Sequence, residues 1–159
     1  MREPVSVKRV LIVEPHLAKA RALARLLDEG AEVAVCRDYS SAQAQLSSQT
    51  PDLLVTQLRL REYNGLHLTY LIAALGAGTR SIVYVDAHDP RVASEFQAAG
   101  AFYEVRDRLA TALRAYVTAE LPAHDRRDVT HRDRRSPSRG GRRASDETRH
   151  SARSRTSVH

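Results

Sequence analysis

The chain has 159 residues, of which 42% are hydrophobic, so it is long enough for one ordinary domain with a sizeable core and a tail. Its net charge is +6, and its single cysteine, Cys36, excludes an internal disulfide and is expected to be a small buried hydrophobe in a reducing compartment. No apolar run has the length of a signal peptide or of a membrane span, so we expect a soluble, cytoplasmic protein.

Five short apolar runs predict five β-strands. They are Val10–Val13, Glu32–Arg37, Leu53–Leu58, Ser81–Val85 and Phe102–Val105. The first, third and fourth runs are almost wholly apolar, as strands covered on both faces are, whereas the second alternates and is expected to be half-exposed. Pro15 ends the first strand because proline has no N–H to continue the ladder.

The segments that follow these strands have apolar residues at helical spacing, which predicts a helix in each. The predicted helices are His16–Asp28, Ser41–Gln49, Leu66–Leu75, a helix from Pro90 to its stop at Gly100, and one along the apolar stripe from Leu109 to Val117. Ser40 and Gln43 have the spacing of a capping box for the second helix, and Asp89 is expected to cap the fourth. Strands that alternate with helices predict an α/β fold, a doubly wound five-stranded parallel sheet with helices on both faces.

The central strand, Leu53–Leu58, carries the most information about function. A polar loop, 59–65, follows it and is predicted to turn through Asn64-Gly65. Ligands and chemistry in an open parallel sheet lie at the carboxyl ends of the strands. The residue at this end is Gln57, an amide with no nucleophilic oxygen.

The tail, residues 122–159, holds 11 arginines against 5 acidic residues and no aromatic residue. Subtracting these from 25 basic and 19 acidic residues leaves 14 of each in residues 1–121, so the whole excess of charge lies in the tail. Such a segment cannot bury enough apolar surface to fold. We therefore divide the chain into a flexible N-terminus (1–7), a domain (8–121) and a disordered Arg-rich tail (122–159).

Five tail arginines are candidates for binding an anion. They are Arg134, Arg135, Arg139, Arg142 and Arg143. Clustered arginines can hold the phosphates of nucleic acid, but without aromatic residues for base stacking the binding is expected to be weak and salt-sensitive. A solvated tail and a linear motif for a protein partner are the alternatives. No membrane insertion is expected.

Residues 8–121 resemble the receiver domain of two-component response regulators. KRVLIVEP is similar to the first strand of that family, DLLVTQLRLREYNGLHL to its third strand and loop, SIVYVDA to its fourth strand, and GAFYEVRDRL to the stretch around its fifth. The resemblance implies a flavodoxin-like fold and a role in bacterial phosphorelay signalling. It also implies partners that are proteins.

The resemblance places the family's phosphorylation residues on specific positions of this chain. Glu14 and Pro15 stand at the acid pair that binds Mg²⁺, Gln57 at the phosphoacceptor aspartate, Asp86 at the hydroxyl residue, Arg106 or Asp107 at the lysine, and Glu104 at the aromatic switch. Glu14 keeps one carboxylate of the acid pair, but the other positions depart from the family pattern. We therefore expect a pseudo-receiver without phosphoryl transfer, enzymatic activity or Mg²⁺. The alternative is that Glu14 and Asp86 together bind Mg²⁺ weakly. We expect Glu14 to form an ion pair with Arg106 or Arg59, contributing about 0–1 kcal/mol.

The function expected from this resemblance is phosphorylation-independent protein–protein contact by a stand-alone domain without an output domain. The family's usual partner surface combines the fourth helix, the fifth strand and the last helix. On this chain it would comprise Arg91, Glu95, Tyr103, Arg108 and Arg114. The alternatives are a nucleic-acid-associated protein that works through its tail, and a working phosphoacceptor that uses another acid such as Asp86. Homodimerisation is left open.

Overall fold

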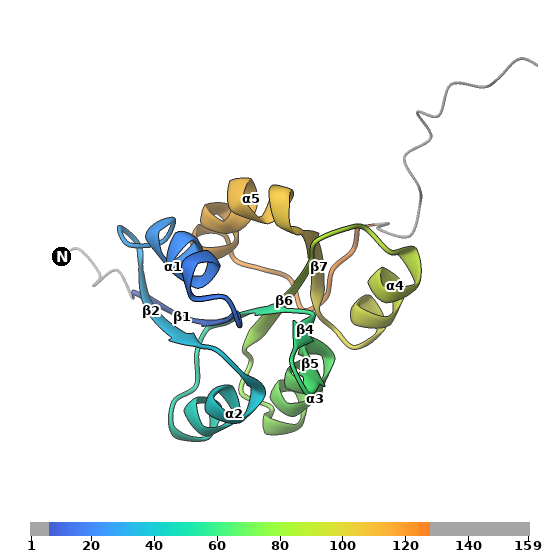
Figure 1. Ribbon diagram of the computed structural model, residues 1–159, viewed down its shortest axis with the longest axis horizontal. Helices are drawn as coiled ribbons and strands as arrows, with labels where there is room; N and C mark the ends of the chain where they lie inside the picture. The colour runs from blue at the N-terminus through green and yellow to red at the C-terminus, as the bar shows by residue number, and fades with distance from the viewer. Residues whose placement is uncertain (1–6, 128–159) are drawn as a thin grey trace, which may run out of the picture.

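The computed structural model describes residues 7–127, and residues 1–6 and 128–159 lie outside the described range. Five parallel strands form one sheet in the order β2-β1-β3-β6-β7 (Figure 1). They are β1 Lys8–Val13, β2 Ala31–Cys36, β3 Leu53–Gln57, β6 Arg80–Val85 and β7 Phe102–Val105. The predicted parallel α/β sheet with β3 at its centre is confirmed.

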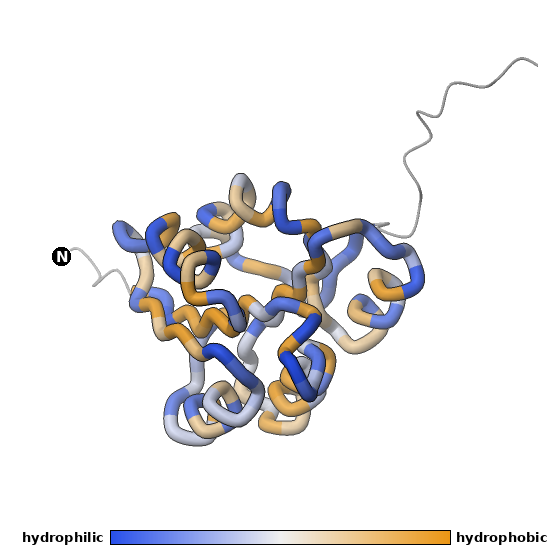
Figure 2. Tube along the Cα trace, in the orientation of Figure 1, coloured by the Kyte–Doolittle hydropathy of each residue, from blue (hydrophilic) through white to orange (hydrophobic). Residues whose placement is uncertain are grey.

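Five helices cover the two faces of the sheet. They are α1 Leu17–Arg25, α2 Tyr39–Ser48, α3 Gly65–Leu75, α4 Pro90–Ala98 and α5 Arg106–Thr118. Helices α1 and α5 lie on one face, and α2, α3 and α4 lie on the other (Figure 1). The chain is hydrophobic along the strands and more hydrophilic in the loops around them (Figure 2). Within residues 7–127, no helix has both the length and the hydrophobicity to cross a bilayer.

The core lies on both sides of β3, whose five residues are all buried. Val55 packs with Leu113 of α5 on one side of the sheet. Leu54 packs with Leu68 of α3 on the other side. Because successive side chains of a strand point to opposite faces, an unbroken apolar run is what a strand between two helical layers requires.

The start of α2 differs from the prediction. Asp38 caps this helix, and its side chain accepts a hydrogen bond from the N–H of Ser41. Ser40 lies within the helix, so the predicted capping box of Ser40 with Gln43 is wrong. Asp and Ser both cap helices well, so neighbouring candidates are hard to separate from sequence. The other predicted cap is confirmed, because the side chain of Asp89 accepts from the N–H groups at the start of α4.

The predicted polar loop 59–65 has regular structure. It contains a two-stranded antiparallel hairpin, β4 Arg59–Leu60 and β5 Tyr63–Asn64. Asn64 then caps α3 by accepting from the N–H of His67, whose side chain completes a capping box. The Asn64-Gly65 pair therefore begins a helix instead of forming the predicted turn. Asparagine is favoured in both settings for the same reason, its short hydrogen-bonding side chain.

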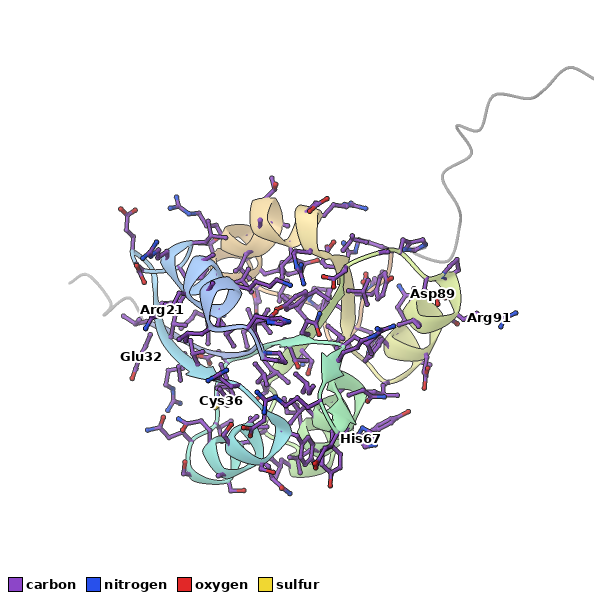
Figure 3. All side chains as sticks on the ribbon, in the orientation of Figure 1. Arg21, Glu32, Cys36, His67, Asp89 and Arg91 are labelled. Atoms are coloured by element: carbon purple, nitrogen blue, oxygen red, sulfur yellow. The ribbon has the colours of Figure 1, made fainter. Side chains whose placement is uncertain are left out.

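Two further expectations need revision. Cys36 is only partly buried at the end of β2 (Figure 3), although burial still raises the pKa of its thiol. Residues 122–127, which we predicted to belong to a disordered tail, lie against β7 and α4. Polar contacts of Asp125 and Arg127 hold them there, and hydropathy alone does not detect such contacts.

Candidate functional site

Glu14 directly follows β1 and is completely buried. Its Oε1 accepts from the backbone N–H of His16 at 2.8 Å, and its Oε2 accepts from the hydroxyl of Tyr84 at 2.5 Å. Burial raises the pKa of Tyr84 far above its ordinary value, and the hydrogen bond to Glu14 raises it further. Tyr84 therefore remains a neutral donor to the buried carboxylate.

The predicted ion pair between Glu14 and an arginine is wrong. Arg106, in the first turn of α5, pairs instead with Asp86 in the loop after β6. The backbone N–H of Arg59 donates to Oε1 of Gln57 at 2.9 Å. No ion pair joins Glu14 to an arginine within residues 7–127, because its carboxylate is enclosed in the sheet and a tyrosine hydroxyl occupies the approach from β6.

Gln57 ends β3; the residue is 8% exposed, and its amide oxygen accepts a hydrogen bond from the N–H of Arg59. Gly65 packs directly against this strand end. A Cβ on Gly65 would lie 2.8 Å from the carbonyl oxygen of Gln57 and 3.0 Å from Cγ2 of Thr56, so only glycine fits without displacing the strand. The hairpin and the start of α3 thus hold the end of β3 in a fixed position.

A surface hollow of about 390 Å³ lies between the end of β3 and the β6–α4 loop. Gln57 and Asp86 are among the residues that line it, whereas Glu14 is not. The side chain of Asp86 is 61% exposed and that of Arg106 is 30% exposed, so water screens their ion pair. Gln57 and Asp86 thus line one hollow, whereas Glu14, at the end of the neighbouring strand β1, is buried.

The two candidates for the lysine position lie differently in the structure. Arg106 reaches Asp86, whereas Asp107 is exposed in the first turn of α5. Pro15 is partly buried, and its carbonyl oxygen accepts from Nε of Arg37.

The donor set at the strand ends does not fit Mg²⁺. This ion requires several oxygen ligands in near-octahedral geometry. Both oxygens of Glu14 accept hydrogen bonds, Asp86 pairs with an arginine, and the Gln57 oxygen is bound by an N–H group. In the described part of the chain, no group of three or more His, Cys, Asp or Glu side chains has a metal-binding arrangement.

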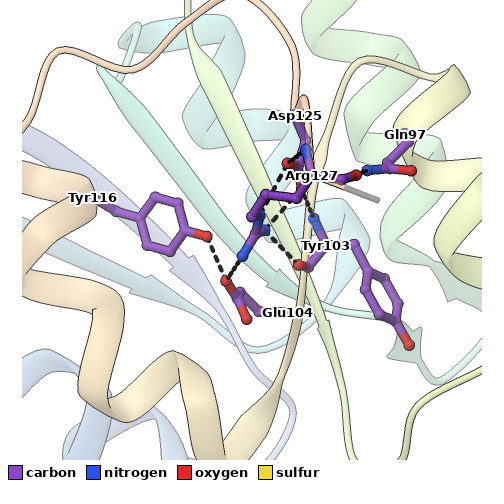
Figure 4. A network of polar contacts seen from close by, with 6 residues as sticks. All are labelled: Gln97, Tyr103, Glu104, Tyr116, Asp125 and Arg127. Carbon is purple, nitrogen blue, oxygen red and sulfur yellow. Dashed lines mark hydrogen bonds and ion pairs between the residues drawn. The ribbon is translucent and has the colours of Figure 1, made fainter. Parts of the chain in front are cut away.

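Glu104, predicted at the switch position, lies on β7 with 3% of its surface exposed. Its Oε1 accepts from the hydroxyl of Tyr116 on α5 and forms an ion pair with Arg127 (Figure 4). The side chain is therefore fixed between a helix and the C-terminal segment. Sequence reasoning missed Arg127 because it falls in a stretch without hydrophobic periodicity.

The predicted partner surface is only partly exposed. Arg91, Glu95 and Arg108 are exposed, and Arg91 lies near Asp89 at the start of α4 (Figure 3). Tyr103 is 2% exposed, and its hydroxyl accepts from the N–H of Asp89 at 3.0 Å, so burial removes it from the surface. Arg114 donates to the carbonyl oxygen of Leu26 at 3.1 Å and therefore lies on the α1 side of α5. The candidate tail arginines, Arg134, Arg135, Arg139, Arg142 and Arg143, lie outside the described residues.

The sequence of this chain matches a known family, in addition to having the strand order and strand-end residues described above. A family profile described as the response regulator receiver domain matches residues 10–110. The chain belongs to the receiver domain family. This receiver domain is thus part of two-component signalling, in which such domains generally act through protein partners instead of as enzymes. No curated protein matches the chain.

Solved receiver structures share the fold. A LuxR-family response regulator from Aurantimonas sp. SI85-9A1 has a TM-score of 0.63 at 23% identity, covering 71% of this chain and 86% of that one. A CheY-like receiver domain protein from Methanospirillum hungatei JF-1 has a TM-score of 0.64 at 21% identity, covering 71% and 95%. The chemotaxis protein CheY4 of Vibrio cholerae has a TM-score of 0.65 at 18% identity, covering 71% and 98%. At these identities the likeness shows the fold alone.

Proposed function

We propose that this receiver domain signals through protein–protein contact without phosphoryl transfer. The observation that carries the proposal is Gln57 at the end of β3, with its amide oxygen held by the N–H of Arg59 at 2.9 Å. In the resemblance to the family, this is the position of the phosphoacceptor. A carboxamide is neutral and does not attack phosphorus at neutral pH, so the transfer has no nucleophile there.

The acids around Gln57 support the same proposal. Phosphoryl transfer requires a cation to neutralise charge on the transferring oxygens. Glu14 accepts hydrogen bonds from Tyr84 and His16, and the carboxylate of Asp86 is already paired with Arg106, so both acids already have protein partners. We therefore propose that the domain works without Mg²⁺ and has no enzymatic activity.

Docking to a partner needs shape and charge but no turnover. Arg91 and Glu95 on α4 and Arg108 on α5 are exposed and offer both signs of charge. An approaching protein can reach these residues, and it can also reach the exposed Arg114, which lies on the α1 side of α5. A mixed-charge surface of this kind favours a specific protein partner with complementary charges.

The test uses the full chain and nuclear magnetic resonance. Addition of beryllofluoride with Mg²⁺, or of acetyl phosphate with Mg²⁺, is expected to leave the amide resonances of residues 57–59 and 86–89 unchanged. A receiver domain with an aspartate at the phosphoacceptor position serves as the positive control. Saturable shifts centred on Gln57 or Asp86 would refute the proposal.

We propose a second, separate activity for the Arg-rich tail, which is weak binding to nucleic acid. The sequence supports it, because residues 122–159 hold 11 arginines against 5 acidic residues while the rest of the chain is neutral. Affinity of this kind falls steeply with salt. Retention of the full chain on heparin should decrease when Arg142 and Arg143 are both replaced by glutamine. Unchanged retention would exclude these arginines as the binding residues.

A further inference from the structure

The edge strand β7 is covered by the chain that follows α5. Strand β7 is last in the sheet order, so one side of it has no neighbouring strand. On that side, the N–H of Tyr103 donates to Oδ2 of Asp125 at 3.4 Å, and its carbonyl oxygen accepts from Nη2 of Arg127 at 2.8 Å. Free strand edges readily pair with other chains. Residues 122–127 therefore take the place that an added peptide strand would occupy.

Arg127 is the anchor of this segment. Its Nη1 pairs with the buried carboxylate of Glu104, and its Nε and Nη2 form two hydrogen bonds to Asp125 at 3.0 and 2.8 Å. The carbonyl oxygen of Arg127 accepts from Nε2 of Gln97 on α4 at 2.5 Å. Asp125 and Arg127 thus attach the segment to β7 and α4, and Tyr116 of α5 donates to the same Glu104 carboxylate that Arg127 binds (Figure 4).

The buried position of Glu104 makes this site selective for a cation. Only 3% of Glu104 is exposed, and its donors among the described residues are the neutral Tyr116 hydroxyl and the Arg127 guanidinium. A buried carboxylate without its cation is strongly unfavourable. An arginine fits because its planar group reaches Glu104 and the Tyr103 carbonyl oxygen at once.

We propose that the α4–β7–α5 face contains a peptide-docking groove for an extended Asp-x-Arg segment, and that this chain fills the groove with its own residues 122–127. The groove opens to the same peptide in trans only when the internal segment leaves. Residues 122–127 therefore lie next to the exposed residues Arg91, Glu95 and Arg108, and they can dissociate from the groove. Binding of residues 122–127 in the groove does not depend on whether Gln57 can accept a phosphoryl group.

The test compares Arg127→Ala with Arg126→Ala in the full chain. Arg126 is the exposed neighbour and is the matched control. Loss of Arg127 is expected to speed amide exchange at Tyr103 by about tenfold or more, because hydrogen bonds to charged groups are worth about 1.5–3 kcal/mol. The control variant is expected to exchange like the wild type. Equal exchange in both variants overturns the proposal.

A synthetic peptide of residues 120–127 then probes the opened groove. Saturable shifts at Tyr103 and Glu104 are expected in the Arg127→Ala chain and not in the wild type. Equal shifts in both chains, or none in the variant, overturn the docking groove. If Arg127→Ala fails to fold, Gln97→Ala loosens the segment without exposing a buried charge. Faster Tyr103 exchange in Gln97→Ala than in Arg126→Ala supports the proposal, and equal exchange overturns it.

Discussion

The hydroxyl of Tyr84 on β6 lies 2.5 Å from Oε2 of Glu14 at the end of β1, so one side chain reaches past the intervening strand β3. This contact places a neutral donor on a completely buried acid. The carboxylate is balanced by two hydrogen bonds, one from Tyr84 and one from the N–H of His16. The strand ends β1 and β6 are thereby connected through a side-chain contact.

Removal of this hydroxyl is expected to destabilise the domain. Tyr84→Phe keeps the buried ring but leaves Oε2 of Glu14 without its donor. We expect the free energy of unfolding in urea to fall by about 1–3 kcal/mol, the cost of a buried group that loses its hydrogen bond. Tyr70→Phe is the control, because Tyr70 is 54% exposed and the change should stay within about 0.5 kcal/mol. Equal effects of the two variants would show that the Tyr84 hydroxyl contributes nothing.

The same tyrosine predicts a loss of stability at alkaline pH. Burial, and then the bond to Glu14, raise the pKa of Tyr84 above the ordinary value of about 10. A raised native pKa gives stability that is fully present below about pH 10 and is lost as the pH rises through the native value. The free energy of unfolding should therefore fall above about pH 10, less steeply in Tyr84→Phe than in the wild type. Tyr116, whose pKa is also raised by burial, accounts for part of the remaining fall. Identical pH dependence in both proteins would contradict this.

The close approach of Gly65 to β3 predicts a cost for a single methyl group. In Gly65→Ala the new Cβ would lie 2.8 Å from the carbonyl oxygen of Gln57, so the strand end or the helix start must shift. We expect a loss of about 1–3 kcal/mol by urea denaturation, with resonance changes at Gln57. Gly30→Ala is the matched control, since nothing lies within 4 Å of its added Cβ. A neutral Gly65→Ala would mean that the contact is not tight in solution.

The ion pair of the exposed Asp86 with the partly exposed Arg106 is expected to contribute little to stability. The two side chains are 61% and 30% exposed, so solvent screens the charges. A double-mutant cycle with Asp86→Asn and Arg106→Gln should give a coupling energy of about 0–1 kcal/mol in urea denaturation. The coupling should decrease further in high salt. A coupling well above this range would indicate a structural role that the exposure does not suggest.

The C-terminal segment is expected to leave β7 at acidic pH. Burial by itself would raise the pKa of Asp125, but its bonds from the Arg127 side chain and backbone outweigh burial and lower it. A lowered native pKa gives stability that is present above about pH 4 and is lost as the pH falls through the native value. Protection of the Tyr103 amide, corrected for intrinsic exchange, should therefore fall below about pH 4.

Asp125→Asn tests whether the Asp125 carboxylate causes this transition, since Glu104 faces the same guanidinium. The variant should show weaker protection of the Tyr103 amide at neutral pH and a smaller change on acidification. Unchanged acid dependence in the variant would show that Asp125 is not the group that causes the transition.

The fold was predictable because each element carries its own signal. The apolar run Leu53–Gln57 needs two covered faces, and Asp89 with Pro90 begins α4 in a way that local sequence specifies. The role of Asn64 was not predictable, because asparagine serves equally well in a turn or at a helix cap. Local patterns therefore yielded the strands and most helices, and they failed where one residue type suits two conformations.

The sequence by itself determined that the central strand ends on an amide and that the charge excess lies beyond residue 121. Only the tertiary structure decided which side chains meet. Tyr84 and Glu14 are 70 residues apart, and Arg127 and Glu104 are 23 apart on different segments. Periodicity reports which face of an element is buried, but it carries no information on which distant donor reaches a buried acid. That pairing follows from the order of the strands and from where the chain returns across the sheet edge.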